Sequence, residues 1–103
     1  MSTSADADAG PASGPAFDPT RPYRVSPSVA LRPEPFGALV YHFGTRKLSF
    51  LKTTELLAVV RGLAEHPSVD AAIAAAGVAE PQRPAYRSAC AGLAANGTIE
   101  ERA

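Results

Sequence analysis

The fold is decided by residues 38–51, which read ALVYHF, GTRK and LSFL. The two outer runs are rich in aromatic and aliphatic residues and flank a turn that contains Gly44, a pattern typical of a β-hairpin. Side chains spaced by two residues lie on the same face of a strand. One face of the sheet is therefore predicted to be apolar, and it holds Leu39, Tyr41, Phe43, Leu48 and Phe50.

The segment before the hairpin predicts one more strand and a tail. Prolines at positions 27, 33 and 35 limit residues 28–32 to a short strand at a sheet edge. Residues 1–22 consist mainly of Ser, Ala, Asp, Gly and Pro and contain one of the 21 Leu, Ile, Val and Phe residues, Phe17. This composition predicts a disordered tail over 1–22 and a folded domain over 23–103.

Three helices are predicted after the hairpin. Thr53 can cap the first, which ends at His66-Pro67, and Ser68 can cap the second, which runs to Ala76 before Gly77. The third begins near Pro84 and ends at Asn96-Gly97. The predicted fold is an α+β domain in which a three-stranded antiparallel sheet is followed by three helices, an arrangement like that of winged-helix proteins.

Charge and composition exclude several classes of protein. The 103 residues carry ten basic and ten acidic side chains, which argues against broad binding to nucleic acid or to an anionic membrane. Residues 21–61 nevertheless hold seven basic and two acidic side chains, a local charge of +5. The single cysteine, the lack of an export signal and the lack of an apolar run of about 18 residues predict a cytoplasmic protein.

No catalytic constellation is found in the sequence. His42 and His66 have no evident acidic or nucleophilic partner, and Cys90 falls on the inward stripe of the last helix. There is no glycine-rich phosphate loop and no group of three cysteines for an iron–sulfur cluster. We therefore expect no catalytic residue, no metal and no cofactor, and hence no enzyme.

The pattern of elements leaves two binding functions open. A winged-helix DNA-binding regulator needs a recognition helix rich in Arg, Lys, Asn or Gln, whereas helix 84–96 offers Arg87 and Asn96 among small residues. Alternatively, the basic strand 47–52 can accept an extended peptide along its free edge. From the pattern alone, Lys47 and Lys52 could equally protect that edge against aggregation.

A family resemblance favours the peptide. Residues 28–52, SVALRPEPFGALVYHFGTRKLSFLK, resemble the PqqD-like precursor-recognition domains, and among them the peptide chaperones of mycofactocin biosynthesis. The resemblance covers roughly residues 23–101, and the stretches LRPEPFGAL and YHFGTRKLSFL carry it. It implies a protein that binds the leader of a ribosomally made precursor peptide and presents it to a radical S-adenosylmethionine enzyme. The iron–sulfur clusters and the S-adenosylmethionine would then belong to that enzyme.

The same resemblance implies where the peptide lies. The leader would run antiparallel to the third strand, in the groove between that strand and the third helix. The implied contact residues are Lys47, Leu48, Ser49, Phe50 and Leu51 on the strand and Arg87, Ala91 and Ala94 on the helix. The predicted core stripe of that helix consists of Tyr86, Ala89, Cys90 and Leu93.

Overall fold

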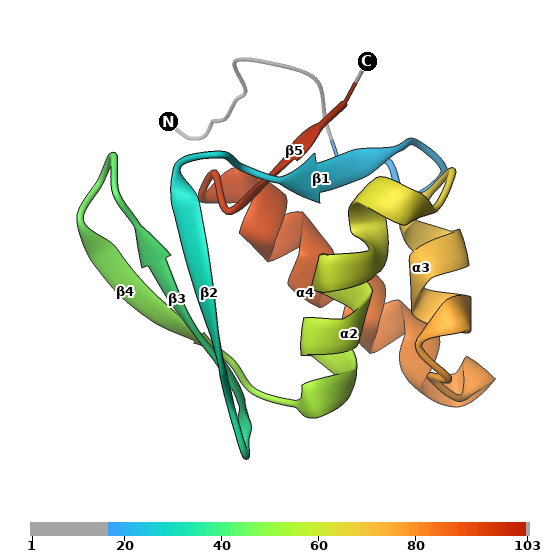
Figure 1. The fold of residues 1–103 in the computed structure, drawn as a ribbon. Helices are drawn as coiled ribbons and strands as arrows, with labels where there is room; N and C mark the ends of the chain where they lie inside the picture. The colour runs from blue at the N-terminus through green and yellow to red at the C-terminus, as the bar shows by residue number, and fades with distance from the viewer. Residues whose placement is uncertain (1–16, 103) are drawn as a thin grey trace, which may run out of the picture.

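The computed structural model describes residues 17–102, which form two antiparallel sheets and three α-helices (Figure 1). In chain order the elements are β1 (Tyr23–Val25), β2 (Val29–Glu34), β3 (Gly37–His42), β4 (Lys47–Leu51), α2 (Thr54–Gly62), α3 (Val69–Ala75), α4 (Arg83–Ala95) and β5 (Ile99–Glu101), with short 3-10 turns at Leu63–Glu65 and Glu80–Gln82. The three-stranded sheet β2-β3-β4 is followed by the three helices. The predicted α+β architecture is confirmed.

A two-stranded sheet of β1 and β5 was not predicted from the sequence. It pairs Tyr23 with Glu101 and Val25 with Ile99, and Arg24 forms an ion pair with Glu100 at 2.7 Å. In Figure 1 this sheet crosses one end of the domain above the helices. It joins the two ends of the described chain, so the domain is closed by contacts between segments more than 70 residues apart.

Residues 17–22, which the composition assigns to the tail, lie against the domain. The Phe17 and Tyr23 rings have centroids 5.1 Å apart, and the Asp18 amide donates a hydrogen bond to the Tyr23 hydroxyl at 3.2 Å. The Asp70 amide donates to the carbonyl of Pro19 at 3.0 Å. Residues 1–16 of the predicted tail lie outside the described residues.

The turns of the main sheet depend on a glycine and a histidine. At Gly37 the backbone has φ of +153°, and a Cβ there would overlap the carbonyl oxygen of Leu51, so only glycine fits this start of β3. In the next turn His42 Nδ1 accepts hydrogen bonds from the amides of Gly44 and Thr45, at 3.1 and 3.3 Å. These contacts fix the β3–β4 hairpin in the register His42 to Lys47.

The helices cover the sheet face opposite to the one that the larger apolar residues share. Ala38, Val40 and Leu51 are buried against the helices, whereas Tyr41 and Phe50 point to the other side and are exposed. The predicted apolar face therefore exists, but it is turned toward solvent. The small Ala38 and Val40 side chains allow α2 to pack closely on β3, which the large residues of the outer face would not.

The predicted helix caps at Thr53 and Ser68 are confirmed. The α-helix α2 ends at Gly62, and the 3-10 turn Leu63–Glu65 continues the chain to the predicted end at His66. The Thr53 side chain accepts a hydrogen bond from the amide of Leu56 and the Ser68 side chain accepts one from the amide of Ala71, each at 3.0 Å. Gly77 has φ of +82° after α3. Between residues 17 and 102 no helix is long and apolar enough to span a membrane.

Candidate binding site

The outer edge of β4 has no backbone partner among the described residues. The sheet order is β2-β3-β4, and no backbone hydrogen bond from another element reaches residues 47–51. The other edge strand, β2, contains Pro33, which has no N–H to offer. The β4 edge is thus the better suited of the two edges for pairing with another strand.

The hydrogen-bond pattern determines which residues face this edge. The Phe43 amide donates to the Ser28 carbonyl at 2.8 Å, which directs the backbone groups of residues 39, 41 and 43 toward β2. In an antiparallel ladder the direction alternates from residue to residue. Ala38, Val40 and His42 therefore bond to β4, through Leu51, Ser49 and Lys47. The N–H and C=O groups of Leu48 and Phe50 consequently point to the open side.

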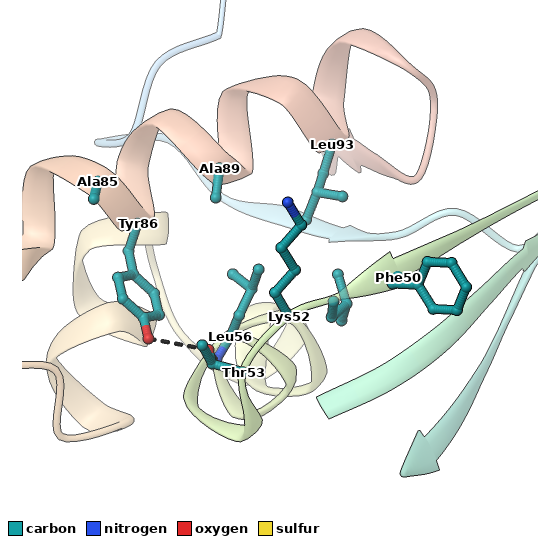
Figure 2. A pocket seen from close by; sticks show the side chains of 9 residues that line it. Phe50, Lys52, Thr53, Leu56, Ala85, Tyr86, Ala89 and Leu93 are labelled. Atoms are coloured by element: carbon teal, nitrogen blue, oxygen red, sulfur yellow. Dashed lines mark hydrogen bonds between the residues drawn. The ribbon is translucent and has the colours of Figure 1, made fainter. Parts of the chain in front are cut away.

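Beside this edge lies a cavity of about 340 Å³ between the end of β4, the start of α2 and one face of α4 (Figure 2). The lining residues are Phe50, Leu51, Lys52, Thr53, Leu56, Ala85, Tyr86, Ala89 and Leu93. Five of these nine residues are leucine or alanine. The volume falls within the range of about 300 to 1,000 Å³ that is usual for ligand-binding pockets.

Polar groups occur at two places in the cavity. The hydroxyls of Thr53 and Tyr86 lie 3.0 Å apart and hydrogen-bond to each other, which links the start of α2 to α4. Figure 2 shows Lys52 reaching from the end of β4 toward α4, while the ring of Phe50 points away from that helix. No carboxylate in the described part of the chain forms an ion pair with Lys52. The cavity can therefore offer an unpaired ammonium group in apolar surroundings.

The helix residues at the cavity differ from those implied by the resemblance. Ala85, Ala89 and Leu93 follow one another at spacings of four and line the cavity together with Tyr86. The implied contacts Arg87, Ala91 and Ala94 are not among the lining residues. The Arg87 guanidinium donates to the carboxylate of Asp70 on α3 at 2.7 Å. Ala94 packs against the core, and Ala91 is half-buried.

The strand residues implied by the resemblance lie along one edge. Phe50 and Leu51 line the cavity, and Lys47, Leu48 and Ser49 extend the same strand away from it. Outside α4, three lining residues were not among the predicted contacts, namely Lys52, Thr53 and Leu56. A signal for them exists in the sequence, because the helix cap at Thr53 marks the point where the chain leaves the strand edge and turns toward α4.

Two titratable side chains near the helices, Cys90 and His66, make contacts within the protein. Cys90 is fully buried, and this burial raises the pKa of its thiol to about 11, so the reactive thiolate is disfavoured. The Nδ1 atom of His66 lies 2.7 Å from the carbonyl oxygen of Gly62. Within residues 17–102 no three His, Cys, Asp or Glu side chains gather into a possible metal site.

Comparison with known proteins identifies a family that matches most of the chain. Residues 22–100 match the family described as the peptide chaperone MftB family. A protein named peptide chaperone MftB from Mycobacterium ulcerans is 60% identical over 79 residues, which are 77% of this chain and 72% of that protein. A protein of the same name from Mycobacterium tuberculosis is 51% identical over 86 residues, 84% of this chain and 79% of the relative. No solved structure matches the chain.

Proposed function

Because the chain belongs to the peptide chaperone MftB family, we propose that it binds the leader of the mycofactocin precursor peptide and delivers this peptide to a radical S-adenosylmethionine enzyme. The family makes the chain a peptide chaperone rather than an enzyme. Our proposal concerns which peptide the chain binds, in which pathway it acts and which enzyme receives the peptide.

The observation that carries this proposal is the open edge of β4 beside an apolar cavity. An extended peptide that pairs with Leu48 and Phe50 continues the sheet by one strand. Its alternate side chains then point to the two faces of the sheet. The side chains on the helix side reach the space between β4 and α4, where the cavity can accept an apolar residue. Main-chain bonds supply affinity, and the cavity supplies specificity.

The charge of the site favours an acidic leader. Residues 21–61 carry a net charge of +5, and Lys52 at the cavity has no ionic partner among the described side chains. An aspartate or glutamate of the peptide next to its apolar anchor can pair with this ammonium group. The wider cationic segment speeds the encounter, because exposed charges act mainly on association rates.

In the proposed mechanism the chaperone acts as a tether. It holds the leader, docks on the enzyme and leaves the reactive end of the precursor free to enter the enzyme's active site. Such linked binding raises the local concentration of substrate to about the millimolar range without any contact at the chemistry. No residue of this chain needs to touch the reacting atoms.

Binding of DNA finds no support in α4. Its two cations are engaged within the protein, because the Arg83 guanidinium donates to the carbonyl of Val78 at 3.0 Å and Arg87 pairs with Asp70. Five of the other eleven residues of the helix are alanine. A recognition helix needs free donors for bases and phosphates, and α4 does not provide them.

Filling the cavity tests the proposal. Ala89→Leu places a larger apolar side chain in the space that the peptide would use, whereas Ala95→Leu makes the same change at an exposed position of the same helix that does not line the cavity. We expect Ala89→Leu to raise the Kd for a synthetic precursor peptide at least tenfold in calorimetry, and Ala95→Leu to leave it unchanged. Wild-type protein that does not bind the peptide, or equal affinities of the two variants, would contradict the proposed function.

A further inference from the structure

The described chain has a second apolar surface, on the side of the sheet away from the helices. The exposed large hydrophobic residues of the described chain all lie on or beside the sheet β2-β3-β4, with between 38% and 58% of each exposed. They are Phe36, Tyr41, Phe43, Leu48 and Phe50. Together with the half-buried Leu39 they form what we call the outer face, on the side of the sheet away from the helices.

The outer face is one continuous patch. Across the β3–β4 ladder Leu39 lies opposite Phe50, and Tyr41 lies opposite Leu48. The Phe36 and Phe50 rings have centroids 6.0 Å apart, and the Tyr41 and Phe43 rings meet edge-on at 5.2 Å. At about 200 Å² for a full aromatic side chain, the exposed parts amount to roughly 500 Å². This is about the size of the largest apolar patch of a typical monomer, and such a patch is often functional.

The charges near the outer face indicate what kind of surface a partner would present. Arg32 lies on this face opposite Leu39, and Arg46 belongs to the turn at the adjoining hairpin end. Lys47 lies opposite His42 and therefore on the helix side of the sheet. Arg32 pairs with Glu34 at 3.1 Å, whereas no carboxylate of the described chain pairs with Arg46. An apolar centre with a cationic border complements an apolar patch bordered by carboxylates.

We propose that the outer face docks a folded partner protein that presents such a carboxylate-bordered apolar patch, and that this partner is the enzyme that receives the peptide. This identification of the partner rests on the proposed function. The patch would bury about two thirds of the roughly 800 Å² per partner that a stable complex needs, and the surrounding polar rim supplies the rest. Phenylalanine and tyrosine are also typical of the centres of protein interfaces.

The position of the patch fits this partner. Phe50 belongs to the outer face and also lines the cavity beside the peptide edge. An enzyme seated on the outer face would therefore lie next to a peptide strand added to β4, and would contact the guest side chains that point to that face. Docking and peptide binding then use adjoining surfaces and can occur together.

Other occupants of the outer face are less well matched. Two copies placed face to face would each bring the same excess of cations to the contact. Residues 1–16 offer only Met1 and five alanines as apolar residues, too little to cover four aromatic rings. A membrane surface is usually recognised by clusters of about four to eight cations, more than border this face.

The test separates docking from peptide binding. Tyr41→Thr/Phe43→Thr removes two rings on the β3 side of the patch and retains residues that suit strands. The control Ala58→Thr/Ala74→Thr changes two exposed helix residues. Circular dichroism and thermal melts verify that both variants fold. Affinity for the radical S-adenosylmethionine enzyme is measured by biolayer interferometry without peptide, and affinity for the precursor peptide is measured by calorimetry.

We expect the patch variant to lose at least tenfold in affinity for the enzyme and to bind the peptide as wild type does, with the control unchanged in both. Unchanged enzyme affinity overturns the docking proposal and leaves the proposed function standing. Failure of wild type to bind peptide overturns the proposed function instead. A self-association in sedimentation velocity, or binding to phosphatidylglycerol vesicles, that the patch variant abolishes while enzyme affinity is retained would also overturn the docking proposal.

Discussion

Replacing Leu48 with proline removes one backbone N–H and so tests whether a peptide adds as a strand to the edge of β4. The alternation of the β3–β4 ladder directs the N–H of Leu48 to the open edge and that of Ser49 toward Val40. Leu48→Pro therefore removes a donor that a guest strand would use and leaves the protein's own ladder intact. Edge positions whose N–H faces outward are the places where sheets tolerate proline.

The expected magnitude follows from one lost hydrogen bond. A backbone hydrogen bond contributes about 0.5 to 1.5 kcal/mol net, and the guest carbonyl that loses its partner stays partly in contact with water. A loss of about 1 kcal/mol corresponds to a roughly fivefold increase in Kd. Leu48→Ala removes the leucine side chain without removing the donor, so the comparison between the two variants isolates the main-chain contribution.

Calorimetry with the synthetic precursor peptide measures this difference, and thermal melts establish that both variants fold. Equal affinities of folded Leu48→Pro and Leu48→Ala would refute peptide pairing at this edge. Ser49→Pro supplies a contrast, because it removes a donor directed toward Val40 inside the sheet. We expect it to lower the melting temperature more than Leu48→Pro does.

Two further predictions concern the cavity. Lys52→Met should weaken binding of the precursor peptide and reduce the salt dependence of that binding, whereas Lys52→Arg should retain the affinity and its salt dependence. Calorimetry at low and high salt checks this, and equal behaviour of the two variants would contradict a charge contact. Tyr86→Phe should destabilise the fold by about 1 kcal/mol, and Thr53→Ala by about 2 kcal/mol because it also removes the cap of α2. Urea unfolding measures both, and a Tyr86→Phe loss as large as that of Thr53→Ala would argue against the separate contribution of the cap.

Local signals in the sequence were sufficient to predict the three-stranded sheet and the three helices. The hairpin, the caps at Thr53 and Ser68 and the left-handed Gly77 each depend on residues that lie within a few positions of one another. The β1–β5 sheet depends instead on residues 23–25 meeting residues 99–101. Strands of three residues carry almost no pattern of their own, and nothing local records a partner so far along the chain.

The site was predictable in its elements but not in its side chains. The open edge of β4 follows from the order of strands and helices. The face of α4 does not, because an alanine-rich helix has a weak apolar stripe. Each residue turns the helix by about 100°, and a shift of two positions exchanges the row of Ala85 and Ala89 for that of Arg87 and Ala91. The pattern also did not determine which sheet face the helices cover, because the larger apolar side chains lie on the exposed face and the buried face relies on Ala38, Val40 and Leu51.

On β4, the backbone groups and the side chain of one residue point in different directions. The proposed peptide contact and the proposed enzyme contact therefore use different atoms of the same residues. Leu48 and Phe50 direct their backbone groups to the open edge and their side chains to the outer face, while Ser49 and Leu51 direct both toward the protein itself. A change of side chain at position 48 therefore acts on the outer face, and loss of the N–H acts on the edge. Peptide and enzyme would share one strand without competing for the same atoms, which is the arrangement that a tether requires.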